Sequence, residues 1–239
     1  MLESLAVLGF GERGWGLALL QGALMTLLVS ACGLAIGAIL GGLAAWGRLS
    51  GSVAGSAAGR SYAAIFRGVP ELLIVYFVYF GTSTLLTGIA QGFGYSGFVG
   101  VPSFAAGALA VGAISGAYQA EVYRAAYLAI GRGELEAAVS VGMGRWLMFS
   151  RIIGPQVMRF ALPALGNLWQ VALKDSSLIA VTGLAELMRI SQVGAASTRR
   201  PFTFYIGGAL LYLVMTLITT RAFDWAEARA TRGMRRAAG

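Results

Sequence analysis

The sequence has no histidine, a single cysteine and few acidic residues, and each scarcity argues against a class of function. Without histidine the chain lacks the commonest general base and the commonest metal ligand, which argues against a metal site and a serine–histidine hydrolase. Cys32 cannot form a disulfide within the chain, and its apolar flanks predict a buried structural thiol. Ten acidic residues against 18 basic ones give a net charge of +8.

Charge of either sign is sparse, and apolar residues dominate instead. Charged residues make up 12% of the chain and hydrophobic residues 57%, whereas soluble domains carry roughly 25% charged residues. This composition is typical of a polytopic membrane protein. The arginines lie at the ends of apolar runs, so we interpret the net charge as setting topology beside lipid headgroups, with no nucleic-acid partner. Glu3 precedes any basic residue and the first apolar run is too long, so no cleavable signal is expected.

Five apolar segments are long enough to span a bilayer, which takes about 20 residues each. We therefore expect an all-α integral membrane fold, with residues 1–239 as a single membrane domain. A Gly/Ser/Arg-rich turn is expected at Gly47–Arg60 and a short loop at 90–102. The predicted spans cover about 15–46, 69–89, 103–126, 160–184 and 202–223.

The arginines orient these spans. With the N-terminus outside and the C-terminus inside, 13 of the 18 basic residues fall in inner segments, which is the bias expected of a membrane protein. Arg189, Arg199 and Arg200 depart from it. Two readings stay open for them: a surface helix facing an external partner, or a misplaced fourth span. The inner residues are Arg48, Arg60, Arg67, Arg124, Arg132, Arg145, Arg151, Arg159, Arg221, Arg229, Arg232, Arg235 and Arg236; Arg13 is outside and Lys174 lies in a span.

An amphipathic segment at about 127–159 interrupts the apolar pattern. Its pattern predicts two short helices, the first with Ala137, Ala138 and Val141 on one face. Gly142 and Gly144 are expected to turn the chain between the two helices. The second helix is predicted to end at Pro155 and to carry an apolar stripe opposite two arginines; the stripe is Trp146, Phe149, Ile152 and Ile153, and the arginines are Arg145 and Arg151.

Two interpretations of this segment compete on physical grounds. An interfacial helix lying on the lipid explains the tryptophan and the arginines. A docking surface for another protein explains the small residues at Ala137, Ala138 and Gly142, which allow close approach. The residues alone leave both interpretations open.

The spacing of the segment resembles that of a known family. Glu136-Ala-Ala, three residues, Gly142, nine residues and Ile152-x-x-Pro155 fit the loop of binding-protein-dependent ABC importer permeases. Further matches over about residues 16–220 resemble the polar amino acid uptake permeases, with closest likeness to histidine/lysine/arginine/ornithine and opine types. One departure is Gly154, where the family has leucine. The matching runs are QGALMTLLVS, FRGVPELLIVYFVYFG, GAYQAEVYRAAYLAIGRGELEAA, PQVMRFALPALGNLWQVALKDSSLIAVTGLAELM and PFTFYIGGALLYLVMT.

The resemblance implies a type I importer subunit in a bacterial cytoplasmic (inner) membrane. Two permeases, expected to form a heterodimer, would enclose the pathway, two cytoplasmic ATPases would bind the loops, and an extracytoplasmic binding protein would deliver substrate. The chain contains no G-x-x-x-x-G-K-[ST], so ATP and magnesium would bind the partner ATPase and this chain would not be an enzyme. The expected ATPase contacts are Arg132, Gly133, Glu134, Glu136, Ala137, Ala138, Gly142, Met143, Gly144 and Pro155.

Polar residues inside spans are costly and mark candidate pathway positions. Glu121 and Arg124 are interpreted as an intrahelical pair. Lys174 and Asp175 point about 100° apart on a helix, so each needs its own partner. An acid at Asp175 would suit a cationic amino acid. The candidate substrate-pathway residues are Glu71, Asn167, Gln170, Asp175 and Ser176.

Glycines recur along the first predicted span. Gly22, Gly33, Gly37, Gly41 and Gly42 are expected to serve helix packing.

Two other classes of function compete with the importer. An ion-gradient-driven secondary transporter or channel is the main alternative, in which the buried acids would be coupling sites. An intramembrane enzyme is disfavoured because the chain offers no nucleophile–base pair.

Overall fold

The structure is a computed structural model that describes residues 7–11 and 14–231, and within those residues it contains helices, turns and loops but no strand. This agrees with the expected all-α fold. Arg13, Arg232, Arg235 and Arg236 of the charge argument lie outside the described residues. The helices are α2 (Gly16–Leu49), α3 (Val53–Gly68), α4 (Glu71–Tyr76), the π-helical η1 (Phe77–Gly81), α5 (Thr82–Gly92), α6 (Ser103–Leu128), α7 (Arg132–Ser140), α8 (Arg145–Met148), the π-helical η2 (Phe149–Ile153), α9 (Gly154–Asp175), the 3₁₀-helical η3 (Ser176–Thr182), α10 (Leu187–Thr198) and α11 (Pro201–Ala230).

The centre of the fold is the pair α2 and α6, which pack against each other more extensively than any other two described helices. Gly33, Gly37 and Gly41 of α2 face α6, and a methyl group added at Gly41 would lie 2.7 Å from the Gly116 carbonyl oxygen. The expected packing role is therefore confirmed for these three glycines and for Gly22, which meets Leu187, but not for Gly42, which has nothing within 4 Å.

A buried amide joins the two central helices. Gln119 of α6 has no exposed surface, and its Nε2 donates to the Leu34 carbonyl oxygen of α2 at 3.1 Å. Its Oε1 accepts from the Tyr123 hydroxyl at 2.7 Å. Because leaving this buried amide unpaired would cost free energy, the bond to Leu34 favours one register of α2 on α6, and the bond from Tyr123, within α6, holds the amide in place.

Helix α3 occupies most of the segment predicted as a turn, so that expectation was wrong. Ser52 caps its start by accepting a hydrogen bond from the Gly55 amide at 3.2 Å. The inward-facing residues Gly59 and Ala63 are buried where α3 packs on α2 and α6. Tertiary packing on small residues therefore overrides the low helix propensity of the glycines.

The second loop helix also differs from expectation, because it does not end at Pro155. Residues 145–182 run on as one helical rod from α8 through η2, α9 and η3. The π-helical turn at Phe149–Ile153 precedes Pro155 and shifts the hydrogen-bond pattern, so that the missing proline N–H does not break the helix.

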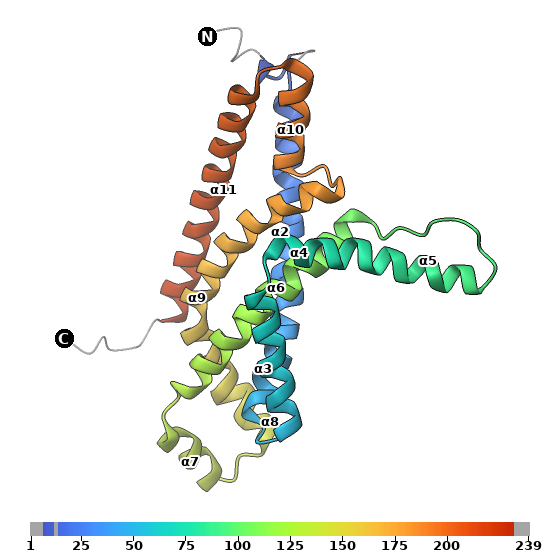
Figure 1. Cartoon of the computed structure of the whole chain (residues 1–239). Helices are drawn as coiled ribbons and strands as arrows, with labels where there is room; N and C mark the ends of the chain where they lie inside the picture. Colours follow the sequence, from blue (N-terminus) through green and yellow to red (C-terminus); the bar gives the residue numbers. More distant parts are fainter. Residues whose placement is uncertain (1–6, 12–13, 232–239) are drawn as a thin grey trace.

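The rod then turns by 52° into α10. Arg189 lies at the start of α10, whereas Arg199 and Arg200 lie at the α10–α11 turn, about 15 Å away along the helix. Helix α10 runs beside the first half of α2 (Figure 1) and packs on α2 and α11. Arg189 is therefore separated from the other two arginines, and both readings of the three residues stay predictions.

By length and apolar composition, three helical stretches of the described chain can cross a membrane: α2, α4 to α5, and α11. The bent pair of Arg145–Thr182 and Leu187–Thr198 makes a fourth. Helix α6 was predicted as a span but is not among these stretches, and many of its small residues are buried where it packs on α2. The count of five spans stays a prediction.

Figure 1 shows α5 and the loop after it extending sideways from the helices around α2 and α6.

Cys32 is exposed on the surface of α2, so the expectation of a buried thiol was wrong. Its helix buries a glycine stripe and leaves the opposite residues uncovered within this chain.

Candidate docking surface and intramembrane polar groups

Helix α7 lies at one end of the molecule, beside α8 and away from the start of α2 (Figure 1). Its C-terminus closes with Gly142 at φ +76°, a left-handed conformation that glycine adopts without strain. The Gly142 amide donates to the Val139 carbonyl oxygen at 3.0 Å, and the Met143 amide donates to that of Ala138 at 3.1 Å. The predicted short first helix and the glycine turn are present, whereas the second helix, α8, is the start of the rod of residues 145–182.

Most residues expected to contact a partner are exposed on α7 and its flanks. Ala138 differs, because it is only 3% exposed. The small residues at 137 and 138 therefore divide, one facing outward and one packing within the chain. Val141 extends the outward face and is 76% exposed. The exposed members of the expected set are Arg132, Gly133, Glu134, Glu136, Ala137, Gly142, Gly144 and Pro155, and Met143 is half-buried.

The apolar stripe of the second loop helix is only partly exposed. Trp146 is 79% exposed and Phe149 is 52% exposed, and their rings stack with centroids 5.9 Å apart. Ile152 and Ile153 are half-buried, as the rod enters the helical body. The exposed aromatic pair thus extends the apolar surface beside α7.

A side-chain bond joins α7 to the long rod. Gln156 of α9 donates through Nε2 to Oε2 of Glu134 in α7. The chain itself links the same two elements through the Gly142 turn and α8. Helix α7 is therefore attached to α9 in two ways, covalently through the chain and through this hydrogen bond.

The expected pathway residues lie around the end of α9, but on different faces. Glu71 begins α4 and Asp175 ends α9, and α4 packs on η3, the helix that begins directly after Asp175. Both side chains are partly exposed. The structure therefore brings these two acids together in one region.

The other three candidates differ in surroundings. Asn167 is exposed on α9, on the same stripe as exposed Lys174. Gln170 donates to the Thr220 hydroxyl of α11 at 3.1 Å. Ser176 is fully buried, and its hydroxyl donates to the Leu173 carbonyl oxygen at 2.8 Å. Only Asn167 of these three has its polar group free on the surface of this chain.

Glu186 was missed by sequence reasoning. It is fully buried and caps α10 by accepting from the amides of Met188 at 2.8 Å and Arg189 at 2.6 Å. Thr26 of α2 and Tyr212 of α11 also donate to its Oε2. An acid just before an apolar helix start was the available signal, and the carboxylate fastens three helices at the bend.

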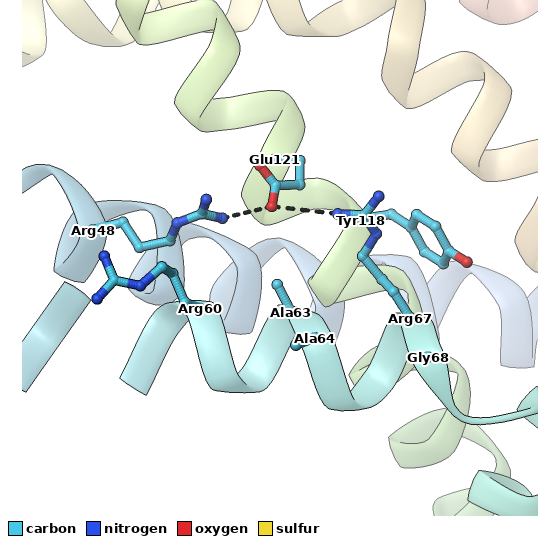
Figure 2. A pocket seen from close by; sticks show the side chains of 8 residues that line it. All are labelled: Arg48, Arg60, Ala63, Ala64, Arg67, Gly68, Tyr118 and Glu121. Atoms are coloured by element: carbon cyan, nitrogen blue, oxygen red, sulfur yellow. Dashed lines mark hydrogen bonds and ion pairs between the residues drawn. The ribbon is translucent and has the colours of Figure 1, made fainter. Parts of the chain in front are cut away.

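Glu121 has more partners than the predicted pair. Its Oε1 lies 2.6 Å from Arg48 of α2 and 3.3 Å from Arg67 of α3, as Figure 2 shows. Arg124, the expected partner, is at 3.5 Å from Oε2. The carboxylate thus ties together α2, α3 and α6, a role that only the fold reveals.

Comparison with known proteins points to one family. The sequence profile described as "Binding-protein-dependent transport system inner membrane component" matches residues 33–232. An octopine transport system permease of Rhizobium meliloti is 50% identical over 97% of this chain and 98% of its own. A nopaline transport system permease of Agrobacterium fabrum is 48% identical, with the same coverage. A histidine/lysine/arginine/ornithine permease of Escherichia coli is 34% identical over 94% and 98%.

Solved structures agree. A chain from the crystal structure of an amino acid ABC transporter with histidines is 33% identical, covers 90% of this chain and 95% of its own, and superposes with a TM-score of 0.74. A chain of the MetNI methionine ABC transporter in an inward-facing form has a TM-score of 0.68 at 19% identity, covers 93% of this chain and 100% of its own, and shares the fold.

Proposed function

Because this chain belongs to the binding-protein-dependent transport system inner membrane component family, we propose that it lines the translocation path of an importer for opines or basic amino acids and is driven through α7. It is a non-catalytic multi-pass permease subunit of the inner membrane. The carrying observation is that α7 exposes the family loop residues and is bonded to α9.

The mechanism follows from how α7 is attached. A partner that moves α7 also moves α9, because the Gly142 turn, α8 and the Gln156–Glu134 bond connect them. Helix α9 packs on α6 and α11, so the movement reaches the helical body. ATP binding on the partner subunits can then bias the permease between inward- and outward-facing states.

The proposed assembly has four kinds of subunit. Two cytoplasmic ATPases, which hold ATP and magnesium, bind α7 of each permease, and an extracytoplasmic binding protein delivers the substrate. The second permease is a sister chain, so the pore is a heterodimer. The likeness to opine and histidine-type permeases supports this arrangement.

We infer that α7 lies in the cytoplasm and that the start of α2 lies outside. Arg48 lies in the last turn of α2, and Arg60 and Arg67 lie on α3, which follows it; in Figure 1 the start of α3 lies toward the α7 and α8 end of the molecule. A positive inner end is the bias expected for membrane proteins. Both observations support an N-out, C-in topology.

The substrate class rests on the relatives and on two acids. The relatives' names specify octopine, nopaline and basic amino acids, all of which carry cationic groups. Glu71 at the start of α4 and Asp175 at the end of α9 supply two carboxylates where α4 packs on η3. We propose that Glu71 and Asp175 bind the cationic group of the substrate.

The Asp175→Asn substitution tests this assignment. We expect uptake of the cationic substrate to fall about tenfold, because a charge-assisted hydrogen bond contributes roughly 1.5–3 kcal/mol. Radiolabelled uptake in reconstituted vesicles measures it, with subunit assembly checked by size-exclusion chromatography. Full uptake by the variant would remove Asp175 from the pathway.

The whole proposal is tested with the purified importer. Loaded binding protein should stimulate ATP hydrolysis by the complex, and substitutions at Glu136 and Gly142 should reduce that stimulation. Absence of stimulation, with both substitutions silent, would refute the assignment. Uptake that persists with a catalytically inactive ATPase would instead favour an ion-gradient-driven transporter.

A further inference from the structure

An open, positively charged pocket lies beside α3, where α3 packs on α2 and α6. Its volume is about 430 Å³. Figure 2 shows Ala63 and Ala64 of α3 between the side chains of Arg60 and Arg67, with Arg48 and Glu121 beyond them. The complete lining is Arg48, Arg60, Ala63, Ala64, Arg67, Gly68, Tyr118 and Glu121.

Positive charge exceeds negative charge in this pocket. Glu121 is its one carboxylate, and it is shared by Arg48, Arg67 and Arg124. Arg60 donates to the Ser56 hydroxyl at 2.8 Å, and among the described residues no carboxylate lies within ion-pair distance of it. A single carboxylate cannot neutralise these guanidinium groups, so the pocket attracts anions.

The pocket also has the room and the donors that a phosphate group needs. Arg60 and Arg67 are seven residues apart and therefore lie on one face of α3, two turns from each other. The residues between and beside them, Ala63, Ala64 and Gly68, are small. Arg67 also stacks over the Tyr118 ring at 5.4 Å, which holds its guanidinium in place. Planar guanidinium groups recognise phosphate oxygens with paired hydrogen bonds.

The surroundings place the pocket at a membrane–water boundary. Trp46, one turn before the end of α2, is 71% exposed, and exposed tryptophans mark the headgroup level. Ile65 of α3 is 57% exposed, so apolar surface adjoins the arginines. Basic pockets between membrane helices at this level suit lipid headgroups.

We propose that the pocket formed by Arg48, Arg60, Arg67 and Glu121 binds a phosphate group, supplied by the headgroup of an anionic membrane phospholipid. The shared chemistry is a phosphate oxyanion, and free inorganic phosphate is the other source. Arg60 is the arginine expected to bind the phosphate most directly, because Arg48 and Arg67 already form ion pairs with Glu121, whereas Arg60 donates to the Ser56 hydroxyl. This site is separate from the acids assigned to the transported substrate.

The test compares lipid binding by the purified importer complex and by two variants. Native mass spectrometry counts phosphatidylglycerol and phosphatidylcholine retained from mixed micelles, and a parallel arm titrates inorganic phosphate. Arg60→Gln removes the guanidinium group that has no carboxylate partner in the described part of the chain, and it leaves the ion pairs of Glu121 in place. Arg221→Gln is the matched control, since Arg221 is an exposed arginine of α11 outside the pocket.

We expect the wild type to retain phosphatidylglycerol over phosphatidylcholine, and Arg60→Gln to retain it about fivefold to tenfold less. Arg221→Gln should behave as wild type. If inorganic phosphate displaces the lipid, with the same loss in Arg60→Gln, the phosphate site stands and its source is free phosphate. Equal retention by wild type and Arg60→Gln in both arms overturns the proposal, provided that the variant elutes as an intact complex.

Discussion

Gly37 shows how one residue sets the distance between the two central helices. An added methyl group there would lie 3.0 Å from the Gly116 amide nitrogen, a backbone atom that cannot move aside. Gly42 lies five residues later on the same helix and has nothing within 4 Å. The same residue type therefore has two roles, and only the neighbour across the interface distinguishes them.

This difference gives a prediction with an internal control. Gly37→Ala should destabilise the permease by about 1–3 kcal/mol, because the added methyl group overpacks the α2–α6 interface. Gly42→Ala should be neutral or slightly stabilising, since alanine is the better helix former. Thermal unfolding in detergent measures both, and equal midpoints would mean that the close α2–α6 contact is absent in solution.

The charged residues can be located in the sequence, but their bonding partners cannot be predicted from it. Glu121 was paired with Arg124 because they are three residues apart, yet its closest partner is Arg48, which is 73 residues away in sequence. Glu186 escaped notice although it is buried and holds Thr26 and Tyr212. Sequence spacing reveals neighbours on one helix, whereas partners on other helices depend on how the helices pack.

Among the elements, α7 follows most closely from its own sequence. Acidic Glu134 lies in its first turn, where the helix dipole favours it, and Gly142 closes the end at φ +76°. Local rules therefore predicted it. The continuous rod from α8 into α9 was not predicted, because Pro155 normally signals a helix boundary and the π-helical turn at Phe149–Ile153 removes the conflict.

The Gly142 turn gives a prediction for this element. Gly142→Ala should weaken the turn by about 1–2 kcal/mol, because a side chain is strained at positive φ. Hydrogen exchange of the α7 amides should become faster. Gly144→Ala, at φ −66°, is the structural control and should leave exchange unchanged. Unchanged exchange in Gly142→Ala would show that the turn does not need its left-handed conformation.

At the scale of the whole molecule, the α5 arm is incomplete by itself. Leu85 is 69% exposed, Ile89 59%, and Phe93, in the loop that follows, 89%. The loop folds back on α5 through the Thr87 hydroxyl, which accepts from the Val99 amide at 3.0 Å. Because the body of this chain does not cover these apolar side chains, we expect a second permease to cover them.

A photo-crosslinking residue at Ile89 tests this contact. In the intact importer it should crosslink to the second permease, because the arm leaves the body of its own chain. As a control, the photo-crosslinking residue is placed at Ile218, which is 63% exposed on α11 and lies outside the arm. Lipid adducts alone at Ile89 would contradict a protein partner for the arm.

The sequence by itself determined the class of fold, the apolar helices, the loop with its glycine turn and the family, because these depend on composition and on spacing within one element. Tertiary structure decided that 53–68 is a helix, that Ala138 packs inward, that Cys32 faces outward, and that Arg48 and Arg67 share Glu121. Each of these depends on what lies across a helix interface. Burial and ion pairing between distant segments are set by packing in three dimensions, which spacing along the chain does not record.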